Sequence, residues 1–457
     1  MAASAEAVAT YDRALDRLLR FHPDVVSLGS ALIVEHPDAA MGHALMAYLN
    51  LMGTNPGDLA AASESARNLS ASATQPRELG HAAAVDAWLA GDWHSASAVL
   101  DDVLQHWPND LLALAIGHQL DFFLGNAANL RDRIGRTAPE FDSEHPHFGF
   151  VQGMHAFGLE EAGHYTQAES AGLAALERNR DDVWAVHAVV HSYEMQGRVE
   201  DGLRFMLGRE SDWWAGNMFT AHNWWHLALF ALEAGDRGRA LAICDAHIHH
   251  DRSDGIPIEL LDASALLWRF ELDGVSTGDR FANVADAWTS VTGDAPWYAF
   301  NDLHAVMAFV GCGRLDDARA LIERLDAFCR TADGAGAETA KEIGLPACRA
   351  VLAFGEQRHG DVISELSPIR NALHRMGGSH AQRDAVQRTL LESTLQSGDF
   401  ESARALTAER LSLRDRAHYN WAQRSRALRG LGQSRAADLA DVRSEENRLR
   451  FAAARAS

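Results

Sequence analysis

The chain has 457 residues, of which 47 % are apolar and 23 % are charged, and its formal net charge at pH 7 is −22. The apolar content excludes wholesale disorder. A single compact core rarely grows beyond about 250–300 residues, so we expect several domains or a repeat array. The acidic balance argues against a nucleic-acid partner, which binds clustered lysine and arginine. No apolar run approaches the about 18 residues of a membrane span, so we expect no membrane partner.

The N-terminal segment and the cysteines indicate the cellular compartment. The first residues, MAASAEAVATYDRALDR, lack the basic region followed by an apolar region that marks a secretory signal. The four cysteines show no C-x-x-C spacing and suit a reducing compartment. They are Cys244, Cys312, Cys329 and Cys348. We therefore expect a cytoplasmic protein, and a homo-oligomer is compatible with the sequence.

Amphipathic helices ended by glycine recur along the chain. Good helix formers dominate, and segments with the alternating pattern of β-strands are absent. A period of 34 residues is that of the tetratricopeptide repeat, a helix–turn–helix pair in which glycine supplies the left-handed conformation after a helix. Ten such glycines recur at intervals of 34 to 47 residues: Gly91, Gly125, Gly163, Gly197, Gly235, Gly274, Gly313, Gly360, Gly398 and Gly432.

The repeat predicts an all-α protein, with tetratricopeptide-like helix–turn–helix pairs forming one α-solenoid over residues 1–457. We expect the first helices of successive pairs to line a concave inner pocket and the second helices to form the back. In chain order we expect N-terminal helices (1–75), repeats that carry the candidate site (76–330), later repeats after a polar loop at 331–344 (331–400), and C-terminal capping helices (401–457).

Histidine is concentrated in the middle of the chain, where 11 of the 23 lie within residues 145–250. His187 and His191 are four residues apart, so they share one face of a helix. His222 and His226 form a second pair with the same spacing. Both pairs fall on first helices of the repeat, which predicts that they face a common wall.

Further polar residues occupy related positions. Glu194 lies one turn beyond His191, and Asp302 and His304 share a later first helix. Counted back from the turn glycine, His304 has the same register as His226, and the register of His155 differs by one residue. We expect Asp302 and His304 to reach the histidine pairs from a later turn of the superhelix.

Three interpretations of the histidines stay open. The pairs His187/His191 and His222/His226 could bind one metal ion such as zinc, with Glu194, Asp302 or Asp245 completing the shell. Alternatively, the imidazoles and Glu194 could perform metal-free acid–base chemistry. The third interpretation is polar packing without chemistry. We expect no nucleotide cofactor, since no phosphate-binding loop or dinucleotide fingerprint is present.

Aromatic and amide side chains in the same stretch are candidates for binding a substrate. Trp184, Asn223, Trp224 and Trp225 could form a wall for a flat or apolar ligand, or could simply fill the interface between repeats. Arg383 follows the glycine-hinged segment GGSHAQRD, 377–384, where it could hold an anionic group or help to cap a helix.

Several segments together resemble the tetratricopeptide repeat protein 38 family. They are PDAAMGHALMAYL (37–49), DVWAVHAVVHSYEMQGRVEDGLRFM (182–206), AHNWWHLALFALEAGD (221–236), CDAHI (244–248), FNDLHAVMA (300–308), IGLPACRA (343–350) and GGSHAQRD (377–384). The matches extend from near the N-terminus to about residue 390. The chain differs from the family pattern at His155, where the family has an aromatic residue. The resemblance implies a cytosolic helical-repeat fold and brings no assigned reaction.

The residues favour an enzyme that acts on a small molecule by hydrolase or lyase chemistry. In this hypothesis His187, His191, Glu194, His222, His226, Asp302 and His304 are catalytic or ligating, and His155, Trp184, Asn223, Trp224, Trp225 and Arg383 bind the substrate. The alternative is a non-catalytic scaffold that binds a protein or peptide segment in its concave groove. Metal sensing or storage is a third hypothesis.

Overall fold

A computed structural model describes residues 4–250, 253, 255–293, 296–332 and 334–454. Within these ranges the secondary structure is helical and no strand occurs. The first half contains α1 (Ala5–Leu19), α2 (Asp24–Glu35), α3 (Ala40–Met52), α4 (Leu59–Ser72), α5 (Pro76–Leu89), α6 (Trp93–His106), α7 (Leu111–Phe123), α8 (Ala127–Thr137), α9 (Phe148–Glu161), α10 (Tyr165–Arg178), α11 (Val183–Met195), α12 (Val199–Gly208) and α13 (Glu210–Trp213).

The second half continues in the same way. It contains α14 (Thr220–Glu233), α15 (Arg237–Ile243), α16 (Pro257–Leu272), α17 (Arg280–Val291), α18 (Ala299–Gly311), α19 (Leu315–Thr331), α20 (Ala335–Thr339), α21 (Leu345–Gly355), α22 (His359–Ile369), α23 (His380–Gln396), α24 (Phe400–Leu413), α25 (His418–Gly430) and α26 (Ser434–Ala454). Short 3₁₀ turns cover Pro56–Asp58, Ala138–Glu140 and Leu373–Met376, and π turns cover Cys244–Ile248 and Ala340–Gly344.

The predicted helix pairs form for local reasons. The helices α9 and α10 are joined at Gly163, whose φ of +83° is a conformation that only glycine adopts readily. Asp182 begins α11, where its side chain accepts hydrogen bonds from the backbone N–H groups of Trp184 and Ala185. The next helix, α12, packs back against α11, so each pair buries its apolar faces against its neighbours. The predicted all-α tetratricopeptide-like solenoid is therefore confirmed.

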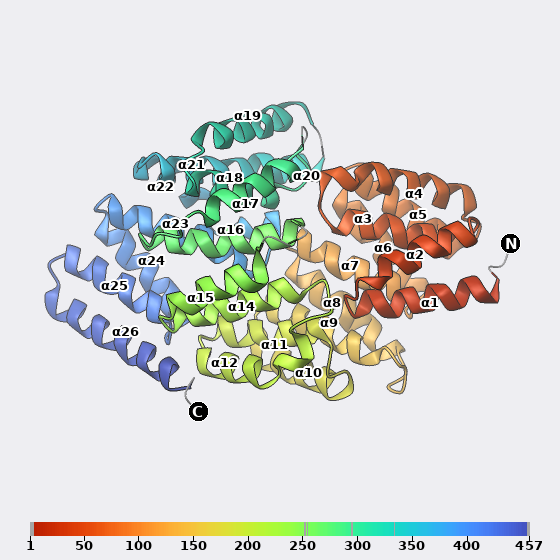
Figure 1. The fold of residues 1–457 in the computed structure, drawn as a ribbon, viewed down its shortest axis with the longest axis horizontal. Coiled ribbons are helices and arrows are strands. Elements are labelled where there is room, and N and C mark those ends of the chain that lie inside the picture. Colours follow the sequence, from red (N-terminus) through yellow and green to blue (C-terminus); the bar gives the residue numbers. More distant parts are fainter. Residues whose placement is uncertain (1–3, 251–252, 254, 294–295, 333, 455–457) are drawn as a thin grey trace.

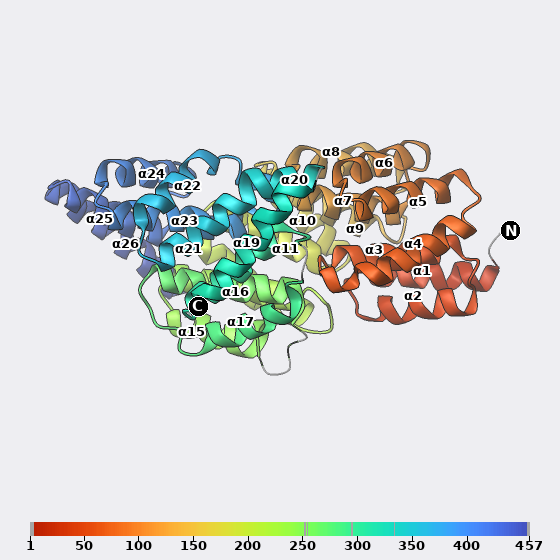
Figure 2. The same ribbon diagram turned by 90° about the horizontal axis from the view of Figure 1, so that it is seen from above.

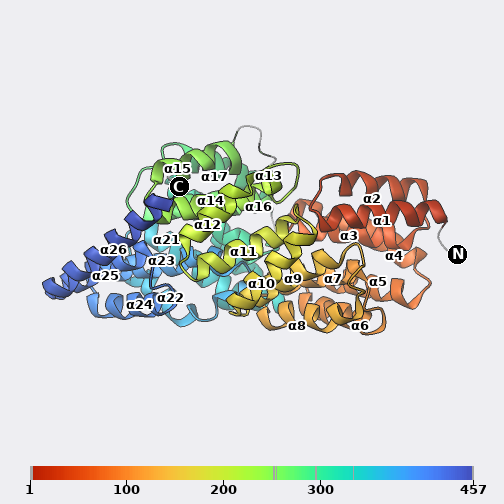
Figure 3. The same ribbon diagram turned by 90° about the horizontal axis from the view of Figure 1, so that it is seen from below.

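The solenoid runs along the long axis of the molecule, from the N-terminal helices at one end to α24–α26 at the other (Figure 1). It also closes on itself. Asn301 of α18 donates a hydrogen bond to the carbonyl oxygen of Thr54, which follows α3. In Figure 2, α20 lies at the boundary with the N-terminal helices, and it contacts α6. At the other end α26 lies beside α12, and Arg450 is 3.7 Å from Glu200 (Figure 3).

Closure covers the inner surface of the solenoid. Twelve of the thirteen residues of α11 are buried, and α23, itself buried over most of its length, packs against α11 and α16. One hydrophobic core extends from Ala14 to Phe451. The inner wall is therefore covered by protein where α23 packs on it, and pockets remain beside this helix.

Two details of the predicted repeat were wrong. The expected polar loop at 331–344 is largely helical, because its alanines are good helix formers and Ala337 and Ala340 are buried; residue 333 lies outside the described residues. Gly360 lies inside α22, and the turn before this helix has Gln357 at a φ of +60°. The long interval of 47 residues in the glycine pattern was counted to Gly360, which is not the residue at the turn.

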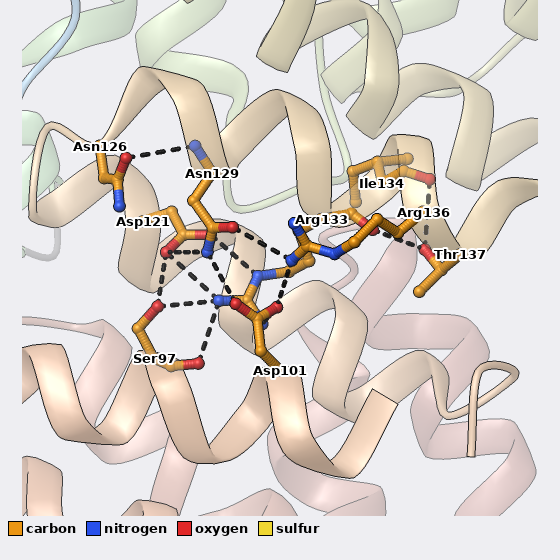
Figure 4. Close-up of polar contacts among 9 residues, drawn as sticks. All are labelled: Ser97, Asp101, Asp121, Asn126, Asn129, Arg133, Ile134, Arg136 and Thr137. Atoms are coloured by element: carbon orange, nitrogen blue, oxygen red, sulfur yellow. Dashed lines mark hydrogen bonds and ion pairs between the residues drawn. The ribbon is translucent and has the colours of Figure 1, made fainter. Parts of the chain in front are cut away.

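A buried ionic network joins α6, α7 and α8 (Figure 4). The fully buried Arg133 forms ion pairs of 2.8 Å with both Asp121 and Asp101, and its Nη2 donates to the Ser97 hydroxyl at 2.8 Å. Gly117 makes room for this guanidinium, because a Cβ atom there would lie 2.6 Å from it. The charges are paired and hydrogen-bonded, as the interior requires.

None of the helices in the described part of the chain has the length and apolarity needed to cross a bilayer.

Candidate metal centre

Four buried histidines meet where α11 packs against α14. His187 and His191 project from α11, and His222 and His226 project from α14. Spacing of four residues puts each pair on one face of its helix, and these two faces point toward each other. We call these four residues the histidine cluster. Their convergence agrees with the common wall that the sequence predicts.

The four rings are in mutual contact. The Nε2 atoms of His187 and His222 are 3.1 Å apart. The ring centroids of His191 and His226 are separated by 4.5 Å, and those of His187 and His191 by 4.3 Å. One nitrogen from each of the four residues lies within 4.8 Å of the others. This spacing suits a shared ion of the zinc type, whose nitrogen ligands lie about 2.0–2.1 Å from the metal.

Carboxylates lie behind three of the four rings. Asp262 of α16 accepts from Nδ1 of His222 at 2.8 Å, and Glu194 accepts from Nδ1 of His226 at 3.0 Å. The Glu160 carboxylate of α9 lies 3.5 Å from Nδ1 of His191. In His222 and His226 the carboxylate holds the proton on Nδ1, so the Nε2 lone pair is directed to the opposite side of the ring. The contact between Glu160 and His191 is not a hydrogen bond.

The opposite sides of these rings face one another. Among the described residues, Nε2 of His191 and Nε2 of His226 have no hydrogen-bond partner. Burial is the main cause that holds the pKa values of His187, His191 and His226 well below the usual range, and the neighbouring histidines add to it. Because His222 is protonated at Nδ1, its Nε2 accepts a hydrogen bond from Nε2 of His187, so the lone pairs left without a partner are those of His191 and His226. A cation at the centre of the cluster would satisfy them.

The acidic groups around the cluster also have perturbed pKa values. Burial raises the pKa of Glu194 to about 7, against the opposing effect of Arg414 and Arg269. Burial and the adjacent Glu161 raise the pKa of Glu160. His191, Glu160 and Glu161 form a second group of potential ligands, which shares His191 with the cluster. Perturbed groups of this kind concentrate at functional sites.

A pocket of about 330 Å³ opens beside the cluster, and we call it the apolar pocket. His187 and His222 lie in its wall, together with Asp182 and Gln382. Most of the remaining wall is apolar or aromatic, and much of it comes from the N-terminal helices and from the segment before α18: Leu18, Leu19, Phe21, Leu49, Met52, Phe122, Phe123, Phe150, Trp184, Phe219, Tyr298 and Phe300. The volume is that of a site for a small molecule.

Asp182 is the acid in the wall with the most unusual environment. Its Oδ1 caps α11, and its Oδ2 has no hydrogen-bond partner among the described residues. Burial raises the pKa of this carboxyl to about 7, although the backbone N–H groups of Ala185 and Trp184 oppose the shift. A carboxyl group that titrates near neutrality can give or take a proton at physiological pH.

Two predicted aromatic residues contact the cluster or the pocket. The Trp184 ring stacks on Phe21 and donates its Nε1 hydrogen to Nε2 of His118 at 3.2 Å. The Trp225 ring stacks on His222 with a centroid separation of 5.3 Å. Trp225 is fully buried, so it supports the imidazole without lining the pocket.

The expectation that Asp302 and His304 reach the histidine pairs is not met. His304 donates its Nδ1 hydrogen to the Phe300 carbonyl oxygen of its own helix at 2.7 Å, so Nδ1 is the protonated nitrogen. Asp302 lies in a separate small cavity beside Thr54 and Arg324, where burial raises its pKa to about 7. The physical reason is that α16 stands between α14 and α18.

The other predicted binding residues lie away from the pocket. His155 is half-buried beside α8, and Trp224 stacks on His247 at a centroid distance of 3.8 Å. Asn223 is buried and donates to the carbonyl oxygen of Val183. Arg383 binds the carbonyl oxygen of Gly378 and lies 3.3 Å from the Glu161 carboxylate, so its own chain occupies the guanidinium that was expected to hold an anion.

Sequence reasoning missed three acids of the site. Glu160 precedes the turn glycine Gly163 by three residues, as Glu194 precedes Gly197, and this shared register was available in the sequence. Asp262 is an acid in the apolar middle of α16, between Leu261 and Ala263, a position that demands a polar partner when it is buried. In the sequence Asp182 is typical of a helix N-cap residue, and only its burial in the structure distinguishes it from the other N-caps.

No family model matches the chain. Among solved structures, it is similar to a monomeric mutant of IFIT1 with Gppp-AAAA (12 % identity, 96 % of this chain and 95 % of that chain, TM-score 0.38). It is also similar to yeast Tom70 (14 % identity, 99 % and 95 %, TM-score 0.34) and to the APC/C hetero-tetramer Cut9–Hcn1 (11 % identity, 98 % and 97 %, TM-score 0.29). Similarity at this level transfers neither a ligand nor an activity to the present chain.

Proposed function

We propose that the chain is a metal-dependent enzyme of hydrolase or lyase type that acts on a small, largely apolar molecule. The observation that carries this proposal is the histidine cluster, in which one nitrogen of each ring lies within 4.8 Å of the others while carboxylates hold the Nδ1 protons of His222 and His226. Carboxylate–histidine–metal arrangements have this form. Four nitrogen donors suit zinc, and imidazole also suits copper, iron and nickel.

In this proposal the three histidines with carboxylates behind them, His191, His222 and His226, hold the metal. Three protein ligands leave a position for water or substrate, as in catalytic zinc sites. The metal supplies Lewis acidity, which polarises a carbonyl group or lowers the pKa of a bound water. His187 lies in the pocket wall, and its Nδ1 has no hydrogen-bond partner among the described residues, so it is our candidate for proton transfer.

The apolar pocket indicates the class of substrate. Aromatic and aliphatic side chains would bury a hydrocarbon or aromatic body of the substrate, while His187, His222 and Gln382 would meet its polar, reactive end. Asp182 is a second candidate for general acid–base work, because its pKa of about 7 lets it exchange a proton near neutral pH. Trp184, in the same wall, would report binding through its fluorescence.

The roles of His187 and His191 can be separated by experiment. The zinc-loaded protein is assayed against a panel of aromatic and alkyl esters, amides and β-hydroxy acids. We expect His191→Ala to lose both metal and turnover, and His187→Asn to keep the metal and lose turnover. The matched control is His94→Ala, at an exposed position of α6. Full turnover in both His191→Ala and His187→Asn, with unchanged helicity, would refute the enzyme proposal.

A second candidate function is the binding of a protein segment. A pocket of about 590 Å³ between α14, α16, α23 and α25 favours it, because its wall carries charged side chains such as Glu271, Glu392 and Arg426. A scaffold predicts that a peptide partner is retained in a pull-down and lost in Arg426→Glu. It also predicts that mutation of His191 leaves this binding unchanged.

We also propose membership of the tetratricopeptide repeat protein 38 family, on the segments that the sequence shares with it. Those segments contribute the histidine cluster and Glu194. A cytoplasmic location is proposed as well, and it is supported by four cysteines that are all free thiols. Secretion of the intact protein with paired cysteines would contradict that location.

A further inference from the structure

A second polar cavity lies among arginines near the C-terminal end of the solenoid. Arg269 comes from α16, Arg388 from α23, and Arg410 and Arg414 from the end of α24. They surround the buried carboxylate of Asp384 and enclose a cavity of about 40 Å³. We call this the arginine pocket.

One carboxylate serves three of these guanidinium groups. Oδ1 of Asp384 is 2.8 Å from Nη2 of Arg410 and 2.8 Å from Nη2 of Arg414, while Oδ2 accepts from Nε of Arg388 at 2.7 Å. Each guanidinium has five N–H donors, whereas a carboxylate offers about four lone-pair sites. The three arginines therefore bring more hydrogen-bond donors and more positive charge than Asp384 can match.

Other nearby groups relieve this excess only in part. Arg269 is buried and donates to the carbonyl oxygens of Ala265 and Ala381, which are neutral. Glu233 lies 3.9 Å from Arg388, and Glu194 also lines the cavity. Four guanidinium groups thus face three carboxyl groups. Buried charge without compensation is costly, so an additional anion is the expected complement.

The cavity is large enough for such an anion and can be reached from solvent. A water molecule needs about 10–15 Å³ of the same kind of volume, so a cavity of about 40 Å³ holds a larger group. The exposed fractions of the Arg388, Arg410 and Arg414 side chains are 11 %, 8 % and 15 %. Their planar forks match the oxygens of carboxylates and phosphates.

We propose that the arginine pocket is a binding site for a small oxyanion, either a carboxylate or a phosphate. The proposal does not depend on the metal or on the enzymatic reaction. The pocket lies close to the histidine cluster, because Glu194 lines the arginine pocket and also accepts a hydrogen bond from His226. An anion bound there would therefore sit next to a residue that positions a proposed metal ligand.

Isothermal titration calorimetry of the full-length protein tests the site, with inorganic phosphate and acetate as probes at constant ionic strength in chloride. We expect at least one probe to bind more tightly than about 1 mM. Arg414→Gln should weaken that binding at least about tenfold. The control is Arg319→Gln, which removes a half-exposed arginine of α19 that pairs with Glu356 away from the pocket and should bind as the wild type does.

The outcomes distinguish a site from general charge attraction. Binding of phosphate alone or of acetate alone supports the proposal and identifies the chemistry. Absence of heat from both probes, or equal weakening by Arg414→Gln and Arg319→Gln, overturns it. If Arg414→Gln does not fold, Arg388→Lys keeps the charge and removes the planar fork. Unchanged affinity in that folded variant would overturn the proposal as well.

Discussion

Replacing Asp262 by asparagine probes the positioning of one proposed metal ligand. In the wild type the carboxylate accepts the Nδ1 hydrogen of His222 at 2.8 Å, which directs Nε2 toward the centre of the cluster. An asparagine of nearly the same shape can present its NH₂ group to Nδ1 instead. The proton then moves to Nε2, and the lone pair needed for the metal is lost. Loss of such an outer partner costs about 10–100-fold in metal affinity, or about 1.4–2.7 kcal/mol.

The assay is a competitive zinc titration against a chromophoric chelator at pH 7.5, with circular dichroism to confirm the fold. Asp245→Asn is the control, because Asp245 is a half-exposed acid that pairs with Arg280 at the surface. We expect its zinc affinity to equal that of the wild type. If folded Asp262→Asn bound zinc within about twofold of the wild type, the inferred role of the carboxylate would be wrong.

Three further predictions concern packing, pH dependence and the pocket. Gly117→Ala should destabilise the protein by about 1–3 kcal/mol in thermal unfolding, because the new methyl group meets the buried Arg133 guanidinium at 2.6 Å. Gly360→Ala is the control, since open space surrounds that position, and it should not destabilise the protein. Equal effects of the two substitutions would contradict this packing. Burial lowers the pKa of His304 to about 4, so the unfolded chain takes up the proton first as the pH falls below about 6.5, and the free energy of unfolding declines. His304→Gln should remove up to about 1.4 kcal/mol per pH unit of this decline between about pH 6.5 and 4. An unchanged dependence of the free energy of unfolding on pH would contradict this prediction. Leu49→Trp should fill part of the apolar pocket and weaken binding of the dye anilinonaphthalene sulfonate about tenfold, and undiminished binding would show that the dye binds elsewhere.

The repeat and the histidine cluster could be predicted because they follow from short-range periodicity. Spacing of four residues fixes a shared face for His187 and His191, and the recurring turn glycines place α11 and α14 as neighbouring first helices. Two neighbouring helices with matched register must bring their faces together. No information about distant parts of the chain was needed for that step.

Long-range contacts could not be predicted in the same way. His304 has the same register as His226, but α16 separates their helices, so the shared register does not bring them together. The closure of the solenoid decides the rest: Phe21 reaches Trp184, and Glu161 reaches Arg383. These contacts depend on the summed rotation of many repeats, in which small deviations accumulate.

The most direct test of the account is the metal content of the purified protein. The wild type is loaded with zinc, passed through a desalting column and analysed by mass spectrometry of its elements, beside His226→Ala and the exposed control His94→Ala. We expect about one zinc ion per chain in the wild type and in His94→Ala, and almost none in His226→Ala. Less than about 0.1 zinc ion per chain in folded wild-type protein, or equal zinc in all three, would contradict the proposed metal centre.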